Sequence, residues 1–479
     1  MTDEQPKRPS RPPVGRFGRL ARIGALGSRA VPLAIAGMRK RFSGEQTEEQ
    51  ERATREKLLI EAKKTAEAML KTLGEMKGLP LKLGQMASYI DGIAPPGYEE
   101  KFQQVLKKLQ AKAPPLSPEA AEKVIKSELG APAEEIFAEF EREPFAAASI
   151  GQVHRATLHS GERVAVKVQY PGIDTAIEND LKTVSLMEQM LAPVGRRYQT
   201  KEGLEEIKRV FMREIDYTQE ANATEAFRKF FADDDTVVIP RVFHSLTTRR
   251  VIVTEFIDGI DYETFCRTAP WSQRHVATKT IWKFMFRSLY EFGTLYADPH
   301  PGNYRFIVDP KKEDDVKVAF LDFGCIRVMS DEMIAGMKRV LIAKMRGTQD
   351  DYEKALVEVY GFDPTDAEGW PLYKAYTDHV MRPLVVDEPF LHTREVAREN
   401  VAFLVRGERK IVWKQGEMLP NLPKPIKMPV ENTFVNRLQW GLASVLAGLS
   451  ADYNFHRLTL PWIEGPRRAP PGLDVPPPV

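Results

Sequence analysis

Two short acidic motifs, joined by a predicted β-hairpin, constrain the fold of this chain more than any other feature of its sequence. The first runs from Asp298 to Asn303, an aspartate and an asparagine with four residues between them. The second is Asp322-Phe323-Gly324, whose aspartate comes nineteen residues after Asn303 (322 − 303 = 19). Residues 304–308 and 316–321 are predicted to be the two strands of a hairpin, joined by the polar turn 309–315. In this order and at this distance the motifs are much less easily produced by chance than either alone. The plain alternative is a hairpin with acidic ends.

The side chains of these motifs are those that hold a metal-bound nucleotide. The carbonyl oxygen of Asn303 and the carboxylate of Asp322 are predicted ligands of Mg²⁺ bridging the β- and γ-phosphates. Asp298 is placed to orient or deprotonate an acceptor. The pair corresponds to the catalytic loop and the D-F-G motif of protein kinases.

Other kinase motifs precede Asp298 in the chain, in the order expected for a kinase. The strand-like segment 163–168 matches V-A-I-K and predicts that Lys167 binds nucleotide phosphates and pairs with a helical glutamate, here Glu220. A lone lysine in a strand is more often solvent-facing, which is the alternative for Lys167. Residues 250–259 predict a strand that runs into a hinge. The residues predicted to contact adenine through their backbone are Glu255, Phe256 and Ile257.

The loop before the lysine strand departs from ordinary kinases. A glycine-rich loop approaches phosphate closely because glycine adopts positive φ. This chain has alanines there, which restrict the backbone and favour a helical turn. Nucleotide must therefore be held differently. The residues of this loop are Ala146, Ala147, Ala148 and Ser149.

A further motif, Lys82-Leu83-Gly84-Gln85, lies inside a helical stretch near the start of the chain. With this K-x-G-Q motif and the alanine-rich loop, the chain resembles the UbiB/ADCK family of atypical kinases, also called AarF-domain kinases. The resemblance runs from about residue 50 to 350, with a continuation to about 455. It implies an α+β, atypical protein-kinase-like fold of two lobes, with an N-terminal helical extension covering the cleft. The E-x-D motif of the family corresponds to Glu214 and Asp216.

The predicted N-terminal extension would exclude peptide substrates from the cleft. Lys82 and Gln85 share one face of their helix. A helix on the acceptor side leaves no groove for an extended peptide. A helix start at 330–333 and the lack of an A-P-E segment leave no room for an activation loop. We therefore expect no peptide phosphorylation. The predicted partners of Lys82, as lid residues, are Glu214, Asp216 and Asp322.

A helical insertion is predicted between Lys167 and Glu220, which lie 53 residues apart (220 − 167 = 53). Residues 173–198 and 204–231 have helical periodicity. The predicted segments are a basic flexible arm (1–45), the helical extension (46–135), a kinase-like N-lobe with the insertion (136–260), a C-lobe (261–455) and a Pro-rich tail (456–479).

Composition and charge limit the classes of partner and the cellular location that we expect. A net charge of +2, without a basic patch interleaved with aromatics, predicts no nucleic acid partner. Cys266 and Cys325 are the two cysteines, which indicates a reducing compartment.

No segment approaches the roughly 20 apolar residues of a membrane span. The basic arm predicts contact with an anionic membrane surface, or else is simply solvated. The helix at 434–449 is expected to pack on the C-lobe core rather than on a membrane. The predicted location is cytoplasmic, with possible peripheral membrane association.

The cofactors predicted are ATP or ADP with Mg²⁺. The resemblance implies an atypical kinase or ATPase that supports ubiquinone or related isoprenoid-lipid metabolism at a membrane. Isoprenoid or quinone lipids, or biosynthetic enzymes, would be its partners. Two alternatives stay open at this point: a small-molecule or lipid kinase that uses Asp298 as base, and a nucleotide-gated scaffold of a biosynthetic complex that does not turn over nucleotide.

Overall fold

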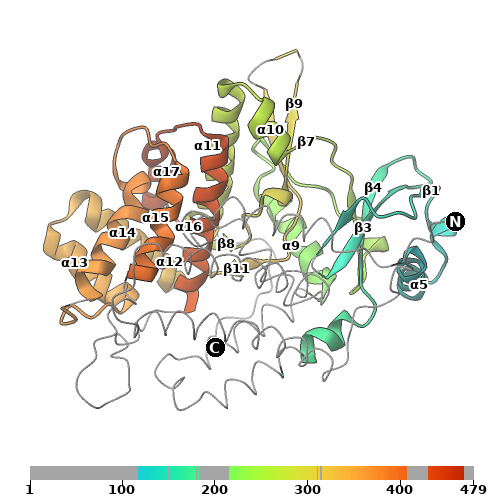
Figure 1. Cartoon of the computed structure of the whole chain (residues 1–479), viewed down its shortest axis with the longest axis horizontal. Helices are drawn as coiled ribbons and strands as arrows, with labels where there is room; N and C mark the ends of the chain where they lie inside the picture. Colours follow the sequence, from blue (N-terminus) through green and yellow to red (C-terminus); the bar gives the residue numbers. More distant parts are fainter. Residues whose placement is uncertain are drawn as a thin grey trace, which may run out of the picture. The chain divides into compact units, whose positions relative to one another are not determined.

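The computed structural model describes the chain in two units (Figure 1), one ending at residue 182 and the other beginning at residue 215. Each unit has its own core and is considered separately. The described residues are 117–148, 150–179, 182, 215–309, 311–312, 315–367, 369–406 and 430–468.

The first unit is a small sheet with a helix packed against it. The strand β3 (Gly151–Thr157) pairs antiparallel with β1 (Glu139–Phe140), β2 (Ala146–Ala147) and β4 (Arg163–Gln169). Every second residue of β4, from Val164 to Val168, is fully buried, which confirms the predicted alternation. The helix α5 (Pro118–Leu129) packs on β4, and the one-turn helix α6 (Ala133–Ile136) leads into β1.

The second unit contains the predicted hairpin. The strands β9 (Tyr304–Val308) and β10 (Val316–Phe320) pair antiparallel, from Val316 opposite Val308 to Phe320 opposite Tyr304. In the described chain they form one sheet with β5 (Val237–Val238) and β7 (Ile260–Asp261), in the order β5-β10-β9-β7. A separate ribbon joins β8 (Thr294–Tyr296) to β11 (Ile326–Val328).

The helix α11 (Trp271–Tyr290) is central to this unit, because it packs against β8, β10, α12, α16 and α17. Figure 1 shows the helices α12–α17 gathered together. Phe284 of α11 is fully buried and stacks on Phe320 of β10 at 3.6 Å. The remaining elements of this unit are β6 (Val251–Glu255), α9 (Tyr217–Phe230), η1 (His244–Leu246), α10 (Tyr262–Thr268), η2 (Pro301–Asn303), α12 (Asp331–Arg346), α13 (Gln349–Tyr360), α14 (Gly369–Val385), α15 (Arg394–Arg406), α16 (Val430–Leu449) and α17 (Phe455–Glu464).

Two element boundaries differ from the predictions. Within the described residues, the helix predicted over 204–231 begins only at Tyr217, because the side chain of Asp216 accepts the Thr218 amide and caps α9. The helix α17 falls inside the range assigned to a Pro-rich tail, and its residues Phe455 and Ile463 are buried. This part of the range is therefore a helix that packs against α11.

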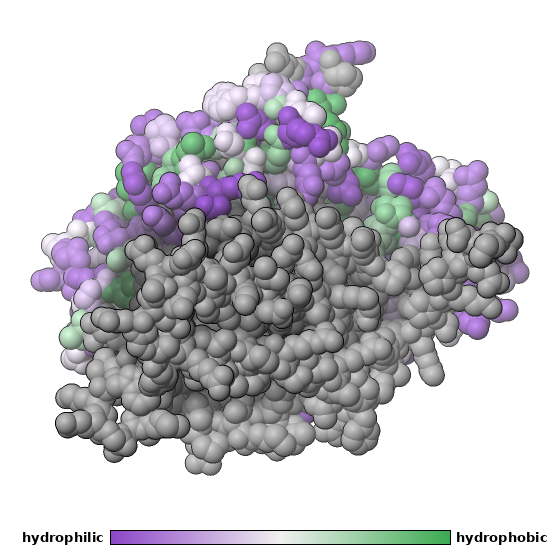
Figure 2. Space-filling view, in the orientation of Figure 1, coloured by the Kyte–Doolittle hydropathy of each residue, from purple (hydrophilic) through white to green (hydrophobic). Residues whose placement is uncertain are grey.

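The helix α16 packs on the core, as expected. Its residues Leu438, Leu442 and Leu446 are buried in the core of the second unit. Within the described residues, no helix combines the length and apolar character needed to cross a membrane. Hydrophilic side chains predominate among the described residues visible in Figure 2.

Candidate active site

The loops at one end of β8, β9 and β10 bring the two acidic motifs together. Asp298 follows β8, Asn303 ends η2 directly before β9, and Asp322 follows β10. Backbone hydrogen bonds fix these loops, because Leu321 donates to the carbonyl of Asn303 at 3.0 Å. The hairpin spacing predicted from the sequence is thus the physical cause of their proximity.

Asn303 is oriented by Asp298. Its Nδ2 donates to the backbone carbonyl of Asp298 at 3.1 Å and lies 3.5 Å from the carboxylate Oδ2. Because the amide nitrogen faces Asp298, the carbonyl oxygen is the atom of Asn303 suited to a cation. Asp298 itself is 9% exposed.

Gly324 allows two carboxylates to approach each other. The Gly324 amide donates to Asp322 Oδ1 at 2.9 Å. A Cβ built on Gly324 would lie 3.2 Å from that oxygen and 3.6 Å from Oε2 of Glu220. Glu220, on α9, is 7% exposed. Glu220 and Asp322 therefore share one small region, and any side chain at position 324 would crowd both.

Phe323 ties this region to the core. Its ring lies 5.1 Å from Phe227, 5.8 Å from Tyr296 and 6.4 Å from Phe284. Phe227 is seven residues after Glu220 on α9 (227 − 220 = 7), about two helical turns further along the same face. The backbone of the D-F-G motif and the helix carrying Glu220 are consequently held by one aromatic cluster.

Tyr296 belongs to the site, although no sequence pattern points to it. Its hydroxyl donates to the backbone carbonyl of Asp322 at 2.7 Å. Burial raises the pKa of Tyr296 well above its usual value, and the neighbouring Tyr304, Asp322 and Asp298 add to the shift. The phenol therefore stays a donor at any physiological pH. A tyrosine in an apolar strand carries no pattern that announces this contact.

Removing the Tyr296 hydroxyl should weaken the predicted Mg²⁺ site without unfolding the chain. In Tyr296→Phe the Asp322 carbonyl loses its donor, which costs about 1–3 kcal/mol for a buried group. We expect the apparent Mg²⁺ affinity, measured by titration at saturating nucleotide, to fall about tenfold, equivalent to 1.4 kcal/mol. The matched control is Tyr352→Phe, which removes a hydroxyl bonded to Asp378 at 3.0 Å. Equal Mg²⁺ affinities in the two variants would contradict this role.

The donor set fits magnesium. Mg²⁺ takes oxygen ligands and is usually bound by one or two carboxylates plus substrate phosphates, not by an all-protein cage. Asp322 and Asn303 offer such oxygens. Within the described residues no group of three His, Cys, Asp or Glu gathers to form a complete metal cage. The ion would supply charge neutralisation of the phosphates.

The alanine loop corrects one prediction. Ala146 and Ala147 do not form a helical turn but the strand β2, opposite Val153 and Gln152 of β3. The Ala148 amide donates to the carbonyl of Gly151 at 2.8 Å and closes the hairpin. Pairing with a neighbouring strand outweighs the weak helical preference of alanine. Contact between this alanine loop and the nucleotide phosphates stays a prediction.

Lys167 lies on the half-buried face of β4, opposite Val153 of β3. Lys167 and Glu220 belong to different units, so their ion pair stays a prediction. The adenine contacts at Glu255, Phe256 and Ile257 also stay predictions; Glu255 ends β6, and its carboxylate accepts the Arg241 amide at 3.3 Å. Other predicted residues lie outside the described chain: Lys82, Gly84, Gln85, Ser149 and Glu214.

The segment after the D-F-G motif is short, as predicted. The strand β11 begins two residues after Gly324, and α12 begins at Asp331, seven residues after it (331 − 324 = 7). The Ser330 side chain accepts the Met333 amide at 3.1 Å and caps α12. An extended peptide-binding activation loop does not fit between these elements.

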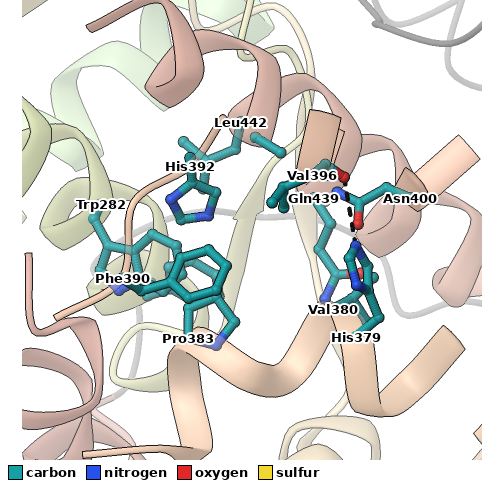
Figure 3. A pocket seen from close by; sticks show the side chains of 12 residues that line it. Trp282, His379, Val380, Pro383, Phe390, His392, Val396, Asn400, Gln439 and Leu442 are labelled. Atoms are coloured by element: carbon teal, nitrogen blue, oxygen red, sulfur yellow. Dashed lines mark hydrogen bonds between the residues drawn. The ribbon is translucent and has the colours of Figure 1, made fainter. Parts of the chain in front are cut away.

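A pocket of about 30 Å³ lies apart from the acidic loops (Figure 3), between α11, α14, α15 and α16. Its lining includes Trp282, Phe390, His392 and Asn400. None of the predicted site residues lines it. The ring of His392 packs against Phe390 and Phe455, at 4.9 and 5.2 Å. Burial, with His379 nearby, lowers the pKa of His392 to about 3.

The neutral His392 predicts a pH effect on stability. Its pKa is about 3 in the folded chain and about 6.5 when unfolded, so the unfolded chain binds the proton first. The contribution to the free energy of unfolding is complete above pH 6.5 and is lost as the pH falls towards 3. His392→Phe should remove up to about 1.4 kcal/mol per pH unit of this slope. Urea denaturation between pH 7 and pH 4 measures it, and identical slopes would refute the assignment.

Comparisons with known proteins agree with this geometry. The curated protein Activity of BC1 complex kinase 7, chloroplastic, of Arabidopsis thaliana is 31% identical over 320 residues, 65% of this chain and 44% of that protein. Atypical kinase COQ8B, mitochondrial, of Rattus norvegicus is 31% identical over 331 residues, 68% of this chain and 59% of that protein. The chain thus spans less than two thirds of the length of either relative.

A solved structure, the complex of Rv3197 with erythromycin from Mycobacterium tuberculosis, covers 87% of this chain and 100% of its own, with a TM-score of 0.56 and 25% identity. Together with the family match over residues 108–356, this likeness confirms the α+β, kinase-like fold. Residues 108–356, or 249 of 479 (356 − 108 + 1 = 249), match the ABC1 atypical kinase-like domain. Because this match covers more than half of the chain and includes both acidic motifs, the protein belongs to the ABC1 family of atypical kinases.

Proposed function

We propose that this protein binds Mg²⁺ with ATP or ADP between the acidic loops and works as an atypical kinase or ATPase. The observation that supports this most is the meeting of the two acidic loops: Asn303 binds Asp298 and accepts from Leu321, next to Asp322. Asp322 and Glu220 in turn approach each other at Gly324. Asn303 and Asp322 would hold the metal, and Asp298 would orient the acceptor or the attacking water. Lys167 would bind phosphate and pair with Glu220.

A small, non-peptide acceptor fits this site best. The six-residue segment between Gly324 and α12 supports the exclusion of extended peptides. Family resemblance favours a role in ubiquinone or related isoprenoid-lipid metabolism at a membrane, with lipids or biosynthetic enzymes as partners. Under this proposal Lys82, Gly84 and Gln85 belong to a lid over the cleft, with Glu214 and Asp216 as partners of Lys82.

Nucleotide assays of the wild-type protein separate the possible activities. We expect MgATP and MgADP to raise the melting temperature, and ATP hydrolysis to increase with vesicles containing anionic lipid. A phosphorylated lipid or small molecule would favour the kinase alternative. Nucleotide binding without any turnover would favour the scaffold, and no Mg²⁺-dependent binding at all would refute the proposal.

The biological role needs a separate experiment. Untargeted lipid analysis of a deletion strain, rescued with the wild type or with Asp322→Asn, identifies the affected lipid class. We expect isoprenoid-quinone lipids to change in the strain and to recover only with the wild type. An unchanged lipid profile would refute the assigned metabolism while leaving the nucleotide chemistry standing.

A further inference from the structure

The β8–β11 ribbon supports the acidic loops at one of its ends. There, Tyr296 donates to Asp322, and the Ala297 amide donates to the Cys325 carbonyl at 2.9 Å. At the opposite end the Met329 amide donates to the carbonyl of Gly293 at 2.9 Å. A two-stranded ribbon by itself is marginally stable in water. The position of the acidic loops therefore depends on the contacts that hold the ribbon, namely the packing of β8 on α11 and the contacts at the far end of the ribbon.

Residues Gly465–Arg468, which we call the post-α17 strap, contact that far end. Arg467 forms an ion pair with Asp331, the first residue of α12. Its guanidinium occupies the space that a Cβ on Gly293 would need. Gly293 has a φ of +66°, a conformation that favours glycine. The strap is also held from α12, because Lys338 Nζ donates to the Gly465 carbonyl at 2.9 Å.

A second route runs from the strap to α9. The Arg468 amide donates to the carbonyl of Glu291 at 2.7 Å, and its Nε lies 2.8 Å from Glu291 Oε1. The Glu291 side chain, 9% exposed, also binds Arg287 at 2.7 Å.

Arg287 in turn contacts the end of α9. Its guanidinium lies 5.1 Å from the ring centre of Phe230 and 5.5 Å from that of Phe231, and binds Asp233 at 3.1 Å. Glu220 lies on this same helix. The strap therefore contacts the far end of the ribbon that holds Asp298 and Asp322, and it is linked through Glu291 and Arg287 to the end of the helix that carries Glu220.

We propose that the post-α17 strap positions the active-site acids, with Arg467 and Arg468 as positioning residues. Arg467 fixes the far end of the ribbon, and Arg468 fixes α9 through Glu291 and Arg287. The consequence for nucleotide binding rests on the proposed function, whereas the consequence for the ribbon does not.

The main test removes both arginines together, because each single substitution leaves the other arginine in place and should give a smaller change in exchange. The ion pair with Asp331 is weak by itself, since the Asp331 side chain is 88% exposed and surface pairs contribute little. Loss of Arg468 alone leaves Glu291 paired with Arg287. The test variant is R467Q/R468Q. The matched control is R457Q, which removes an arginine of α17 that binds Asp387 at 2.6 Å, away from the strap.

Hydrogen–deuterium exchange of the full-length chain, read by mass spectrometry, measures the ribbon directly. We expect faster exchange in peptides covering 293–297 and 325–329 of R467Q/R468Q, and wild-type exchange in the β9–β10 hairpin. We also expect MgATP affinity, measured well below the melting temperature, to fall about two- to thirtyfold, the range for substitutions that act without touching the ligand. R457Q should match the wild type in both measurements.

Ribbon exchange equal to that of R457Q overturns the proposal. Faster ribbon exchange with unchanged MgATP affinity overturns the link between strap and site. If the wild type binds no Mg-nucleotide, the proposed function fails, yet the exchange result still decides whether the strap holds the ribbon. Should the double variant not fold, R468Q and R467Q are measured singly, and wild-type ribbon exchange in both overturns the proposal.

Discussion

Asp322→Asn is expected to abolish useful Mg²⁺-dependent nucleotide binding while leaving the fold intact. The new amide oxygen can still accept from Gly324, so the D-F-G turn keeps its hydrogen bond. The charge that would bind the metal under the proposed function is lost. Removing one partner of a desolvated charge pair costs about 3–5 kcal/mol, and 1.4 kcal/mol is tenfold in affinity. We therefore expect affinity for MgATP to fall by about 100-fold or more.

Thermal-shift titration with ATP, with and without Mg²⁺, measures this loss. The matched control is Asp315→Asn, the same change at the other end of the hairpin, where Asp315 pairs loosely with Lys312 at 3.7 Å. The control should keep the wild-type shift. A full Mg²⁺-dependent shift in Asp322→Asn would remove Asp322 from the metal site and with it the main support for the proposed function.

Phe227→Ala should cause a large loss of stability, about 3–5 kcal/mol in the free energy of unfolding. Phe227 is fully buried, and its ring lies 5.6 Å from Phe284 and 6.0 Å from Phe292, besides its contact with Phe323. Truncation leaves a cavity that these large rings fill only in part.

Urea denaturation of Phe227→Ala, with Phe227→Leu as the control, measures this effect. Leucine retains most of the apolar volume, so the control should lose much less stability than the alanine variant. Equal, small losses in both variants would mean that the aromatic cluster is not the joint between α9 and the D-F-G motif.

Local signals in the chain were enough to predict the hairpin and the helix after it. Short apolar runs over 304–308 and 316–321, separated by a polar turn, are typical of two strands of a hairpin. Ser330 before Asp331 and Glu332 is a helix start at which the side chain itself supplies the cap. Because the motifs flank these elements directly, Asp298, Asn303 and Asp322 could be placed together without any coordinates.

The alanine loop shows where local preference fails. Alanine favours helix by less than about 1 kcal/mol over other residues, and pairing with β3 makes Ala146 and Ala147 extended. The helix predicted over 204–231 would have Asp216 in its interior, and this is wrong for a similar reason. The carboxylate of Asp216 competes with the helix by binding the Thr218 amide, and Asp216 begins α9 instead.

Contacts between segments distant in the chain could not be inferred from any window of sequence. Glu220 lies about a hundred residues before Gly324 (324 − 220 = 104), yet its carboxylate limits the space there. Tyr296 reaches a backbone carbonyl, which is present at every residue and leaves no mark in the sequence. Arg467 occupies the space beside Gly293, 174 residues earlier (467 − 293 = 174). Such contacts depend on the packing of whole elements, whereas period, cap and turn depend only on neighbours in the chain.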